Sequence, residues 1–402
     1  MKLNNKNIEF SFFLDLFFKE KSFPPFYKKI TNTFSKKVVY EIHNDTTLEL
    51  NSSTYSISDV PSYFLSEFTE TVHNFKLLTT PLYSGYLINL SKFRDLEDYL
   101  DNKLGKPRKS QLKRYRKRLD KCLSPEYKIF HGDISKETYH TLFNELRTLT
   151  ERRFAQKEEL NFELPYLELY RDMMYPLIIN KKASIFVIYS EAKPINITLN
   201  FIDDDSIFHW NSCYDVDYQM FNLGHINMVN HLEWAFKNNF KLFDMGRGDF
   251  LHKRKYINES YMYEEHIIYK PKSISGSFFA YSKLLKLKAR YILIQFLKKT
   301  NIHLRYRNYV KYKYRIVNSK NSPLINFKIN IDETSSETLN IKPLTLLCLS
   351  NKEYNYLIKP LNYFLHKTQE HIKDVSVYKD LNKEQTFYFK GIKKYQKIII
   401  TN

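Results

Sequence analysis

The stretch Phe243-Asp244-Met245-Gly246-Arg247-Gly248-Asp249-Phe250-Leu251-His252-Lys253 is the most informative part of this sequence. It places Gly, Asp, Arg and Lys directly behind a short apolar, strand-like segment. Only eight glycines occur among 402 residues, and two of them bracket Arg247. Glycine tolerates backbone conformations that other residues resist. The stretch therefore predicts a tight, charged turn at the end of a strand.

The segments around this turn predict a sheet with one intervening helix. Apolar and polar residues alternate strictly from Ile195 to Phe201, which indicates a strand with one buried face. A helix is expected from Gly224 to about Asn239, since its apolar residues recur at helical spacing. The expected strands are 183–189, 195–201, 206–214, 241–244 and 261–269.

The rest of the chain is less sharply patterned. Helices are expected over 108–120, 136–153, 164–179 and 278–299, and strands over 37–42, 54–57, 84–90, 127–130, 324–331 and 345–350. We expect three domains: a small N-terminal α/β domain (1–104), a central domain (105–270), and a basic helix followed by a small C-terminal α/β domain (271–402). The predicted fold class is α/β (α+β).

Basic residues are concentrated in two regions. The formal net charge is +19, which favours anionic partners such as nucleic acid, an anionic membrane face or phosphate-bearing ligands. Ten basic residues and one acid, Asp120, lie between Lys103 and Lys121, around an apolar stripe of Leu112, Tyr115 and Leu119. Residues 266–331 contain fifteen Lys and Arg and no Asp or Glu.

Cysteine and histidine usage limits the classes of protein. The three cysteines lie far apart in the sequence, which favours a reducing compartment. The N-terminal sequence fits neither a signal peptide nor a membrane span, so a cytoplasmic protein is expected. The twelve histidines show no metal-binding spacing, and no metal is expected. Neither a P-loop nor a GxSxG motif is present.

The order of strands and helix, with the charged turn behind it, resembles the acetyltransferase fold called GNAT. It is most similar to the branch of BioF2-like and CelD-type acetyltransferases, which are related to the FemAB aminoacyl transferases. The resemblance covers about residues 105–270 and is carried by residues 192–195, 211–215, Gly224, the run 243–249 and His252-Lys253, with the basic segment 108–116 upstream. It implies a mixed, mostly antiparallel sheet flanked by helices. It also allows that the N-terminal domain is a degenerate GNAT-like half.

The resemblance further implies acyl transfer from acetyl-CoA to an amine or hydroxyl, on a small molecule, a sugar or a polysaccharide precursor. A strand edge would hold the pantetheine arm and a helix N-terminus the diphosphate. The implied donor-binding residues are Asn211, Ser212, Gln219, Gly224 and His225. The usual glycine-rich cradle is reduced to Gln219 and Gly224. The sequence therefore leaves an aminoacyl-tRNA donor, or a lost activity, as alternatives.

Four residues are candidates for catalysis, each with a structural alternative. Asp244 can orient an amine or act as a base, or can cap the amides of the turn. Arg247 can pair with a substrate anion, or with Asp244 or Asp249 in a structural bridge. Lys253 can stabilise an oxyanion or hold an acidic acceptor, or can be a solvated lysine. Tyr214 can act as a general acid or be a core tyrosine.

Two further functions remain open from the sequence. The basic segment 103–121 suits the backbone of a tRNA, as a FemAB-like transferase would require. The helix 278–299 suits a non-catalytic scaffold or a peripheral membrane contact, although its apolar residues can equally be buried. Residues 151–153 (Glu-Arg-Arg) can line an acceptor pocket or form a charged helix end.

Overall fold

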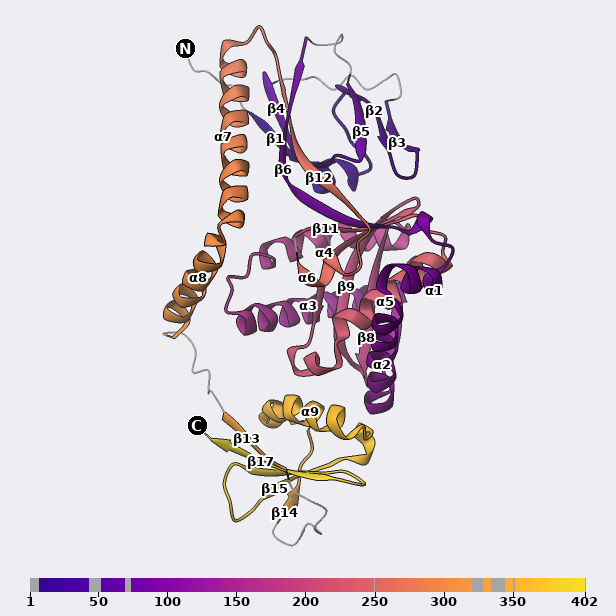
Figure 1. Ribbon diagram of the computed structural model, residues 1–402, viewed down its shortest axis with the longest axis vertical. Coiled ribbons are helices and arrows are strands. Elements are labelled where there is room, and N and C mark those ends of the chain that lie inside the picture. Colours follow the sequence, from indigo (N-terminus) through magenta and orange to yellow (C-terminus); the bar gives the residue numbers. More distant parts are fainter. Residues whose placement is uncertain are drawn as a thin grey trace. The chain divides into compact units, whose positions relative to one another are not determined.

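The computed structural model of the chain describes residues 7–42, 52–68, 74–248, 250–319, 328–333, 344–349 and 351–401 (Figure 1). These residues form two compact units, each assembled from separate stretches of the sequence. Unit 1 comprises residues 1–103, 201–210 and 235–307, and unit 2 comprises residues 104–200, 211–234 and 308–402. Strands β9 (Lys193–Asp203) and β10 (Ser206–Tyr214) contribute residues to both units.

Unit 1 is built on a sheet whose neighbouring strands come from distant parts of the chain. Its strands follow the order β1 (Ile8–Ser11), β4 (Thr54–Pro61), β12 (Glu259–Tyr269), β6 (Lys76–Asn89) and β11 (Leu242–Arg247). Strand β12 is antiparallel to β4 and β6, and β6 is antiparallel to β11. The start of β10 pairs in parallel with β11, from Ser206↔Leu242 to Phe208↔Asp244.

A second sheet and several helices complete unit 1. Strands β3 (Lys37–Glu41), β2 (Tyr27–Asn32) and β5 (Phe64–Phe68) form a separate three-stranded sheet. The helices are α1 (Leu96–Tyr99), α6 (Leu251–Arg254) and α7 (Ile274–Lys299), and α8 (Ile302–Ser319) begins in this unit. The apolar segment near the N-terminus is a π-helical turn, η1 (Phe12–Phe17), whose phenylalanines are buried. Aromatic rings therefore supply much of this core.

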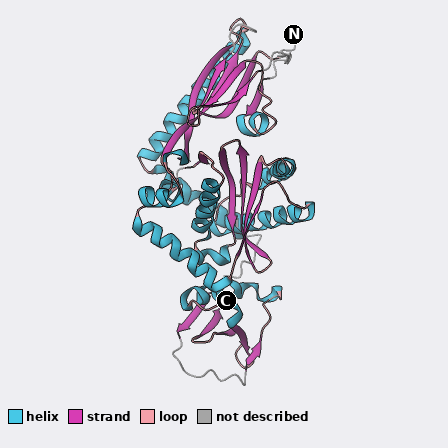
Figure 2. Ribbon diagram, turned by 90° about the vertical axis from the view of Figure 1, so that its right-hand side faces the viewer, coloured by secondary structure: helices cyan, strands magenta, loops and turns pink. Residues whose placement is uncertain are grey.

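Unit 2 contains most of the expected central elements. Strand β7 (Glu126–Phe130) pairs antiparallel with β8 (Ala183–Ser190), and β9 and β10 follow in the strand order. The helices are α2 (Lys106–Leu123), α3 (Lys136–Lys157), α4 (Leu164–Ile179) and α5 (Leu223–Lys237). In Figure 2, coloured by secondary structure, helices lie beside strands of the sheet. The predicted mixed α/β class, with a mostly antiparallel sheet flanked by helices, is confirmed.

The expectation that β9 has one buried face is wrong, because both faces are buried. Its polar positions Asn196, Thr198 and Asn200 are fully buried, like the apolar residues between them. Hydrogen bonds compensate part of this burial. The Asn196 amide donates to the carbonyl of Cys213 (3.0 Å), and the Asn227 amide on α5 donates to the Thr198 hydroxyl (2.8 Å). Alternation of polarity here marks a polar network beneath a helix and not a solvent-facing side.

The C-terminal part of the chain belongs to unit 2 and shares a hydrophobic core with the rest of that unit. We call its described residues 328–333, 344–349 and 351–401 the C-terminal module. Its strands follow the order β13 (Lys328–Glu333), β17 (Tyr395–Thr401), β16 (Thr386–Lys390), β15 (Ser376–Asp380) and β14 (Leu344–Leu346), and its helix is α9 (Ile358–Thr368). Phe364 and Phe389 pack in one cluster with Leu119 of α2 and Phe221. The expected strand residues 324–327 and 350 lie outside the described residues.

The two basic helices differ in how they bury apolar residues. On α2, Leu112 and Leu119 are buried and Tyr115 packs against the core, so the predicted stripe is confirmed. On α7, only Gly276, Ala280 and Leu284 are buried. Most of the apolar residues of α7 are thus exposed. Among the described helices, none is both long and apolar enough to cross a membrane.

Candidate functional site

The charged turn at the end of β11 has the backbone that its glycines predict. Gly246 has φ +66° and Gly248 has φ +99°, conformations that side chains with a Cβ rarely adopt. A Cβ placed on Gly248 would lie 2.5 Å from the ring of Phe250. The turn therefore depends on both glycines, as expected.

Asp244 is the buried centre of this turn. Its side chain is 2% exposed and accepts hydrogen bonds from the hydroxyls of Tyr63 (2.7 Å) and Tyr261 (2.7 Å), and from the amide of Gly246 (2.7 Å). Burial raises the pKa of the Asp244 carboxyl above its ordinary value, although these hydrogen bonds and Lys253 oppose the rise. Asp244 thus caps the turn, and its pKa is raised.

Three tyrosines surround that carboxylate. The hydroxyls of Tyr261 and Tyr263 lie 2.7 Å apart, and the rings of Tyr63 and Tyr261 meet edge to face. Burial, together with the charge of Asp244, raises the pKa of Tyr63 and of Tyr261 well above the ordinary value. Both hydroxyls therefore stay protonated and act as donors to Asp244.

Lys253 is fixed against the same turn and is not a freely solvated lysine. Its ammonium group donates to the backbone carbonyls of Met245 and of Arg247, the latter at 2.7 Å. Burial lowers the pKa of Lys253 to about 8; the charge of Asp244 opposes this effect and that of Arg247 adds to it. A lysine with such a pKa exchanges a proton close to neutral pH.

Arg247 points toward a different set of partners. Its guanidinium lies 5.9 Å from the ring centroid of Tyr83, a cation–π arrangement. The Tyr83 hydroxyl donates to the carboxylate of Asp59. Burial raises the pKa of Tyr83, and Asp59 adds to the rise while Arg247 opposes it. Asp249, the other partner considered for Arg247, lies outside the described residues.

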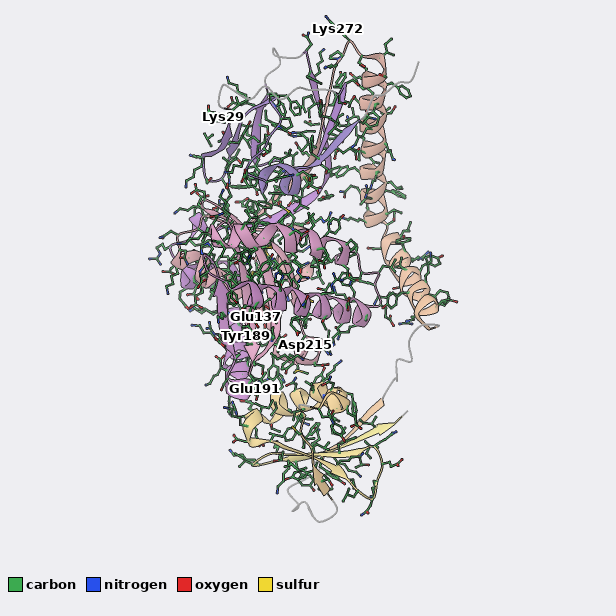
Figure 3. All side chains as sticks on the ribbon, turned by 180° about the vertical axis from the view of Figure 1, so that it is seen from behind. Lys29, Glu137, Tyr189, Glu191, Asp215 and Lys272 are labelled. Atoms are coloured by element: carbon green, nitrogen blue, oxygen red, sulfur yellow. The ribbon has the colours of Figure 1, made fainter. Side chains whose placement is uncertain are left out.

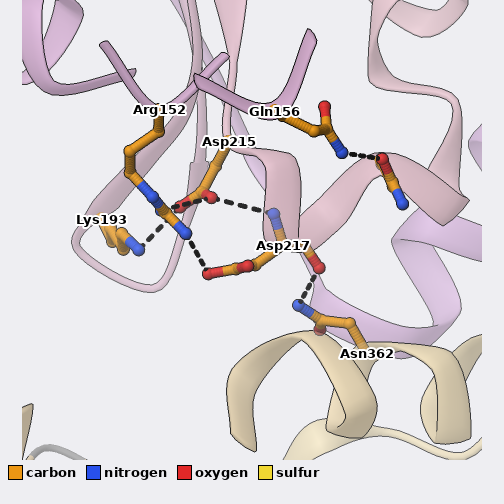
Figure 4. A network of polar contacts seen from close by, with 7 residues as sticks. Arg152, Gln156, Lys193, Asp215, Asp217 and Asn362 are labelled. Atoms are coloured by element: carbon orange, nitrogen blue, oxygen red, sulfur yellow. Dashed lines mark hydrogen bonds and ion pairs between the residues drawn. The ribbon is translucent and has the colours of Figure 1, made fainter. Parts of the chain in front are cut away.

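Unit 2 holds a second polar cluster around Asp215 and Asp217, which follow the end of β10 in the sequence (Figure 4). Arg152 donates to Asp215 (2.7 Å) and to Asp217 (2.6 Å), and Lys193 pairs with Asp215 (2.8 Å). The side chain of Asp215 is fully buried. Burial opposes the charge of Arg152, but the two carboxylates together raise its pKa. Arg152, whose side chain is 37% exposed, therefore ties α3 to Asp215 and Asp217.

This cluster fixes the 3₁₀ segment η4 (Val216–Phe221), which connects β10 to α5. The Asn362 amide, on α9, donates to the carbonyl of Asp217 (3.0 Å). Gln219 accepts from Gln156 of α3 (2.6 Å) and donates to the hydroxyl of Tyr363 (3.2 Å). Elements from three parts of the sequence thus hold the segment that leads into the N-terminus of α5.

The residues expected to bind the donor lie along this path. On β10, the Asn211 amide donates to Glu163 (3.2 Å), and the hydroxyls of Ser212 and Thr198 lie 2.7 Å apart. A Cβ placed on Gly224, in the first turn of α5, would have no atom within 4 Å.

A cation also lies at the start of α5. The guanidinium of Arg108 contacts the imidazole of His225, with Nη2 3.2 Å from Nε2. The Nε of Arg108 is buried and has no hydrogen-bond partner in the described structure. The start of α5 therefore combines an open backbone with a positive charge, which suits an anion.

Tyr214 lies at the end of β10, beneath a cation. Its ring centroid is 4.5 Å from the guanidinium of Arg153. Burial raises the pKa of Tyr214, although Arg153 opposes the rise. Its hydroxyl therefore remains protonated at neutral pH and is able to act as a donor.

The structure brings the predicted site residues together in two groups. Asp244, Arg247 and Lys253 form one group in unit 1. The other six residues follow one another along β10, η4 and the start of α5 in unit 2: Asn211, Ser212, Tyr214, Gln219, Gly224 and His225. Among the described residues, no group of three or more His, Cys, Asp and Glu is arranged to hold a metal ion.

Sequence reasoning missed the groups that support these residues. Tyr63 and Asn362 are distant from their partners in the sequence, Tyr261 is 17 residues from Asp244, and no local pattern marks any of the three. Gly85 offered a signal, because a glycine inside a strand often marks a close approach by another group. A Cβ at Gly85 would lie 2.2 Å from the ring of Tyr261, the tyrosine that donates to Asp244.

Comparison with known families supports the interpretation of the central segment. Residues 106–254 match the family model described as "Acetyltransferase (GNAT) domain". This part of the chain is a GNAT-type acyltransferase domain, and the predicted resemblance to GNAT is confirmed. The matched segment includes all nine predicted site residues.

The chain is also similar, at low identity, to several solved structures. The chain is similar to L-PGS from Bacillus licheniformis, with 14% identity, a TM-score of 0.36, and coverage of 57% of this chain and 72% of that one. It is also similar to FemX, with 11% identity, a TM-score of 0.37, and coverage of 54% and 72%. Among curated proteins, no match is found.

Proposed function

We propose that the chain transfers an acetyl or related acyl group from a CoA thioester to an amine or hydroxyl, on a sugar, a polysaccharide precursor or another small molecule. The observation that carries this proposal is Lys253, which is held by two backbone carbonyls beside buried Asp244 within the GNAT segment. Acyl transfer requires a group that accepts a proton near neutral pH. Lys253 meets that requirement.

The proposed reaction is direct attack within a ternary complex. The acceptor nitrogen or oxygen forms a bond with the acyl carbon, the thioester C–S bond breaks, and neutral Lys253 takes the proton that the acceptor loses. Asp244 has its oxygens occupied by Tyr63, Tyr261 and Gly246, so its role is to position the turn. Arg247 lies at the same turn and is proposed to attract an acidic acceptor.

Donor binding is assigned to unit 2. A diphosphate suits the first turn of α5, where Gly224 leaves open space and Arg108 supplies a cation. Asn211 and Ser212 of β10 are proposed to contact the pantetheine arm, and Gln219 and His225 the region around the diphosphate. Tyr214 is proposed to protonate the leaving thiolate.

The donor assignment is tested by calorimetric titration with acetyl-CoA, CoA and bulk tRNA. Gly224→Glu places a negative charge in the open space, and Gly224→Gln is the neutral control of the same size. We expect Gly224→Glu to weaken CoA binding by about tenfold or more, through charge at the helix N-terminus and Arg108, and Gly224→Gln to weaken it much less. Absence of CoA binding at millimolar concentration would contradict the assignment.

A second candidate, transfer from an aminoacyl-tRNA, is favoured by the exposed basic face of α2. Lys106, Arg114, Lys117 and Lys121 are all exposed. If tRNA is the donor, its binding should weaken steeply with added salt, and Lys117→Glu/Lys121→Glu should lower both the affinity and the salt dependence. CoA binding without tRNA binding would exclude this candidate.

A further inference from the structure

Helix α7 carries an apolar stripe on its exposed side. Ile274, Phe278, Tyr281, Leu285, Ile292 and Phe296 recur at helical spacing and lie on one face. Each is between 49% and 89% exposed. Exposed apolar residues are common one at a time, but six of them on one face of a 26-residue helix are not.

The opposite side of α7 already has its partner. Ala280 and Leu284 pack against Ile267 and Tyr269 of β12, in a small cluster within unit 1. Figure 1 shows α7 lying along the strands of this unit. The helix is therefore fixed by its narrow buried face, to which Tyr281, at the edge of the stripe, adds a contact with Tyr269.

Helix α7 carries positive charge and no acidic residue. At about 100° per residue, Lys286, Lys288 and Lys299 lie beside the stripe, whereas Arg290 and Lys298 lie farther round the helix. Lys286, Lys288, Arg290, Lys298 and Lys299 are exposed, and none of them forms an ion pair with a described residue. Lys283 differs, because it pairs with Glu9 and Glu265. Lys272, labelled in Figure 3, adds an exposed cation in the turn that leads into α7.

This combination discriminates between occupants of the face. A second copy of α7 would bring like charges together with no acidic residue on either helix to pair with them. Nucleic acid is bound by cations and stacking aromatic rings, and exposed Ile and Leu along the centre of the face add nothing to that. A basic helix with an apolar stripe matches an anionic lipid surface, into which the stripe inserts while the flanking cations meet the headgroups.

We infer that α7 docks this protein onto an anionic membrane surface and lies in the plane of the interface. Each cation near such a surface strengthens binding by about fivefold, and the buried stripe adds an apolar contribution. The inference concerns a surface of unit 1 and does not depend on which acyl donor or acceptor the protein uses.

The test is flotation of the full chain with vesicles of phosphatidylcholine, with and without phosphatidylglycerol, at low and high salt. Wild type should float with the anionic vesicles at low salt and less at high salt. Phe278→Ser/Leu285→Ser/Ile292→Ser and Lys286→Glu/Lys288→Glu/Lys299→Glu should each lower partitioning by about tenfold or more. All six side chains are exposed, so unchanged thermal unfolding is expected and serves as the check of folding.

Matched controls come from the C-terminal module. Leu346→Ser/Leu381→Ser/Ile392→Ser removes three side chains of similar exposure, and Lys383→Glu/Lys393→Glu/Lys394→Glu makes the same change in charge. Both should float like wild type. Equal losses in controls and α7 variants would overturn the inference, as would flotation of the α7 variants at the wild-type level. Loss of tRNA binding or of a dimer, without any vesicle binding by wild type, would also overturn it.

Discussion

Gly85 is the residue on which the packing around Asp244 depends. It lies in β6, opposite Tyr261 of β12 in the antiparallel register. The absence of a side chain lets the ring of Tyr261 cross the strand and place its hydroxyl 2.7 Å from Asp244. A position far from the charged turn in the sequence thus controls the hydrogen bonds of its central carboxylate.

Gly85→Ala should displace Tyr261 and lower the free energy of unfolding by about 2 kcal/mol, through overpacking and loss of a buried hydrogen bond. Urea unfolding measures the change. Gly224→Ala is the control, since its new methyl group meets open space and should change stability little. Equal stability of Gly85→Ala and wild type would show that the ring of Tyr261 relaxes without cost.

The lowered pKa of Lys253 makes stability depend on pH. Between about 8 and the ordinary value of 10.5, the unfolded chain binds a proton at Lys253 that the folded chain has lost. Stability therefore rises with pH across this window, by up to about 1.4 kcal/mol per pH unit. The destabilisation caused by burying the charged Lys253 amine is fully present below pH 8.

Lys253→Met should remove that part of the pH dependence, which unfolding measured at a series of alkaline pH values will show. Lys255→Met, at an exposed neighbouring lysine, should keep the wild-type slope. Identical slopes for Lys253→Met and wild type would contradict the buried position of the amine.

At the scale of single residues, the sequence revealed those site residues whose type is rare in this chain. Gly246 and Gly248 were found because glycine is rare in this chain, and their φ angles confirm the prediction. Tyr63 and Tyr261 were not found, because tyrosine is abundant here and their contacts are formed only when distant strands pair. The catalytic and donor-binding roles remain proposals.

At the scale of elements, η4 is the segment most dependent on its neighbours. It has no long helix or strand of its own to stabilise it, and α3 and α9 hold it through Arg152 and Asn362. Helix α9 therefore helps to position η4, the segment that leads into α5.

Asn362→Leu should leave the carbonyl of Asp217 without its partner inside the protein. We expect a loss of about 2 kcal/mol in unfolding free energy and weaker donor binding, measured by urea unfolding and calorimetry. Tyr363→Phe removes a hydrogen bond from a tyrosine that is 43% exposed, and should cost much less. Wild-type donor affinity in Asn362→Leu would separate α9 from the proposed site.

Strand and helix positions between residues 126 and 269 agree closely with the sequence prediction, because long periodic segments dominate there. The prediction failed where tertiary context decides. The polar residues of β9 predicted a solvent-exposed face, yet α5 covers them, and the Asn227 amide donates to the Thr198 hydroxyl. Strand β6 begins at Lys76, well before the expected 84–90, because its first half owes its strand structure to pairing with β12.

At the scale of the whole molecule, the C-terminal module and α2 complete a single core. Phe389 is fully buried in the same cluster as Leu119 and Phe221. A substitution in the module should therefore destabilise the packing of residues that lie far before it in the sequence. The sequence did not reveal this sharing, since the apolar pattern of each segment is compatible with a separate core.

Phe389→Ala should lower the free energy of unfolding by about 4 kcal/mol. Because the core is shared, the fluorescence of Trp234, followed in a Trp210→Phe background, should report the lowered transition. Ile392→Ala, at a 73% exposed side chain, should leave the transition in place. An unshifted Trp234 transition in Phe389→Ala would show that the module unfolds independently.

The shared core also has a consequence for biosynthesis. Leu119, Ile195 and Phe221 leave the ribosome long before Phe364, Phe389 and Ile398, the residues that cover them. During translation, the apolar side chains of the acyltransferase segment therefore stay exposed until the C-terminal module has been made. Nascent chains in such a state recruit chaperones. Synthesis of β17, which carries Ile398 and Ile400 of this cluster, ends the exposure, so a chain truncated before β17 should be prone to aggregation.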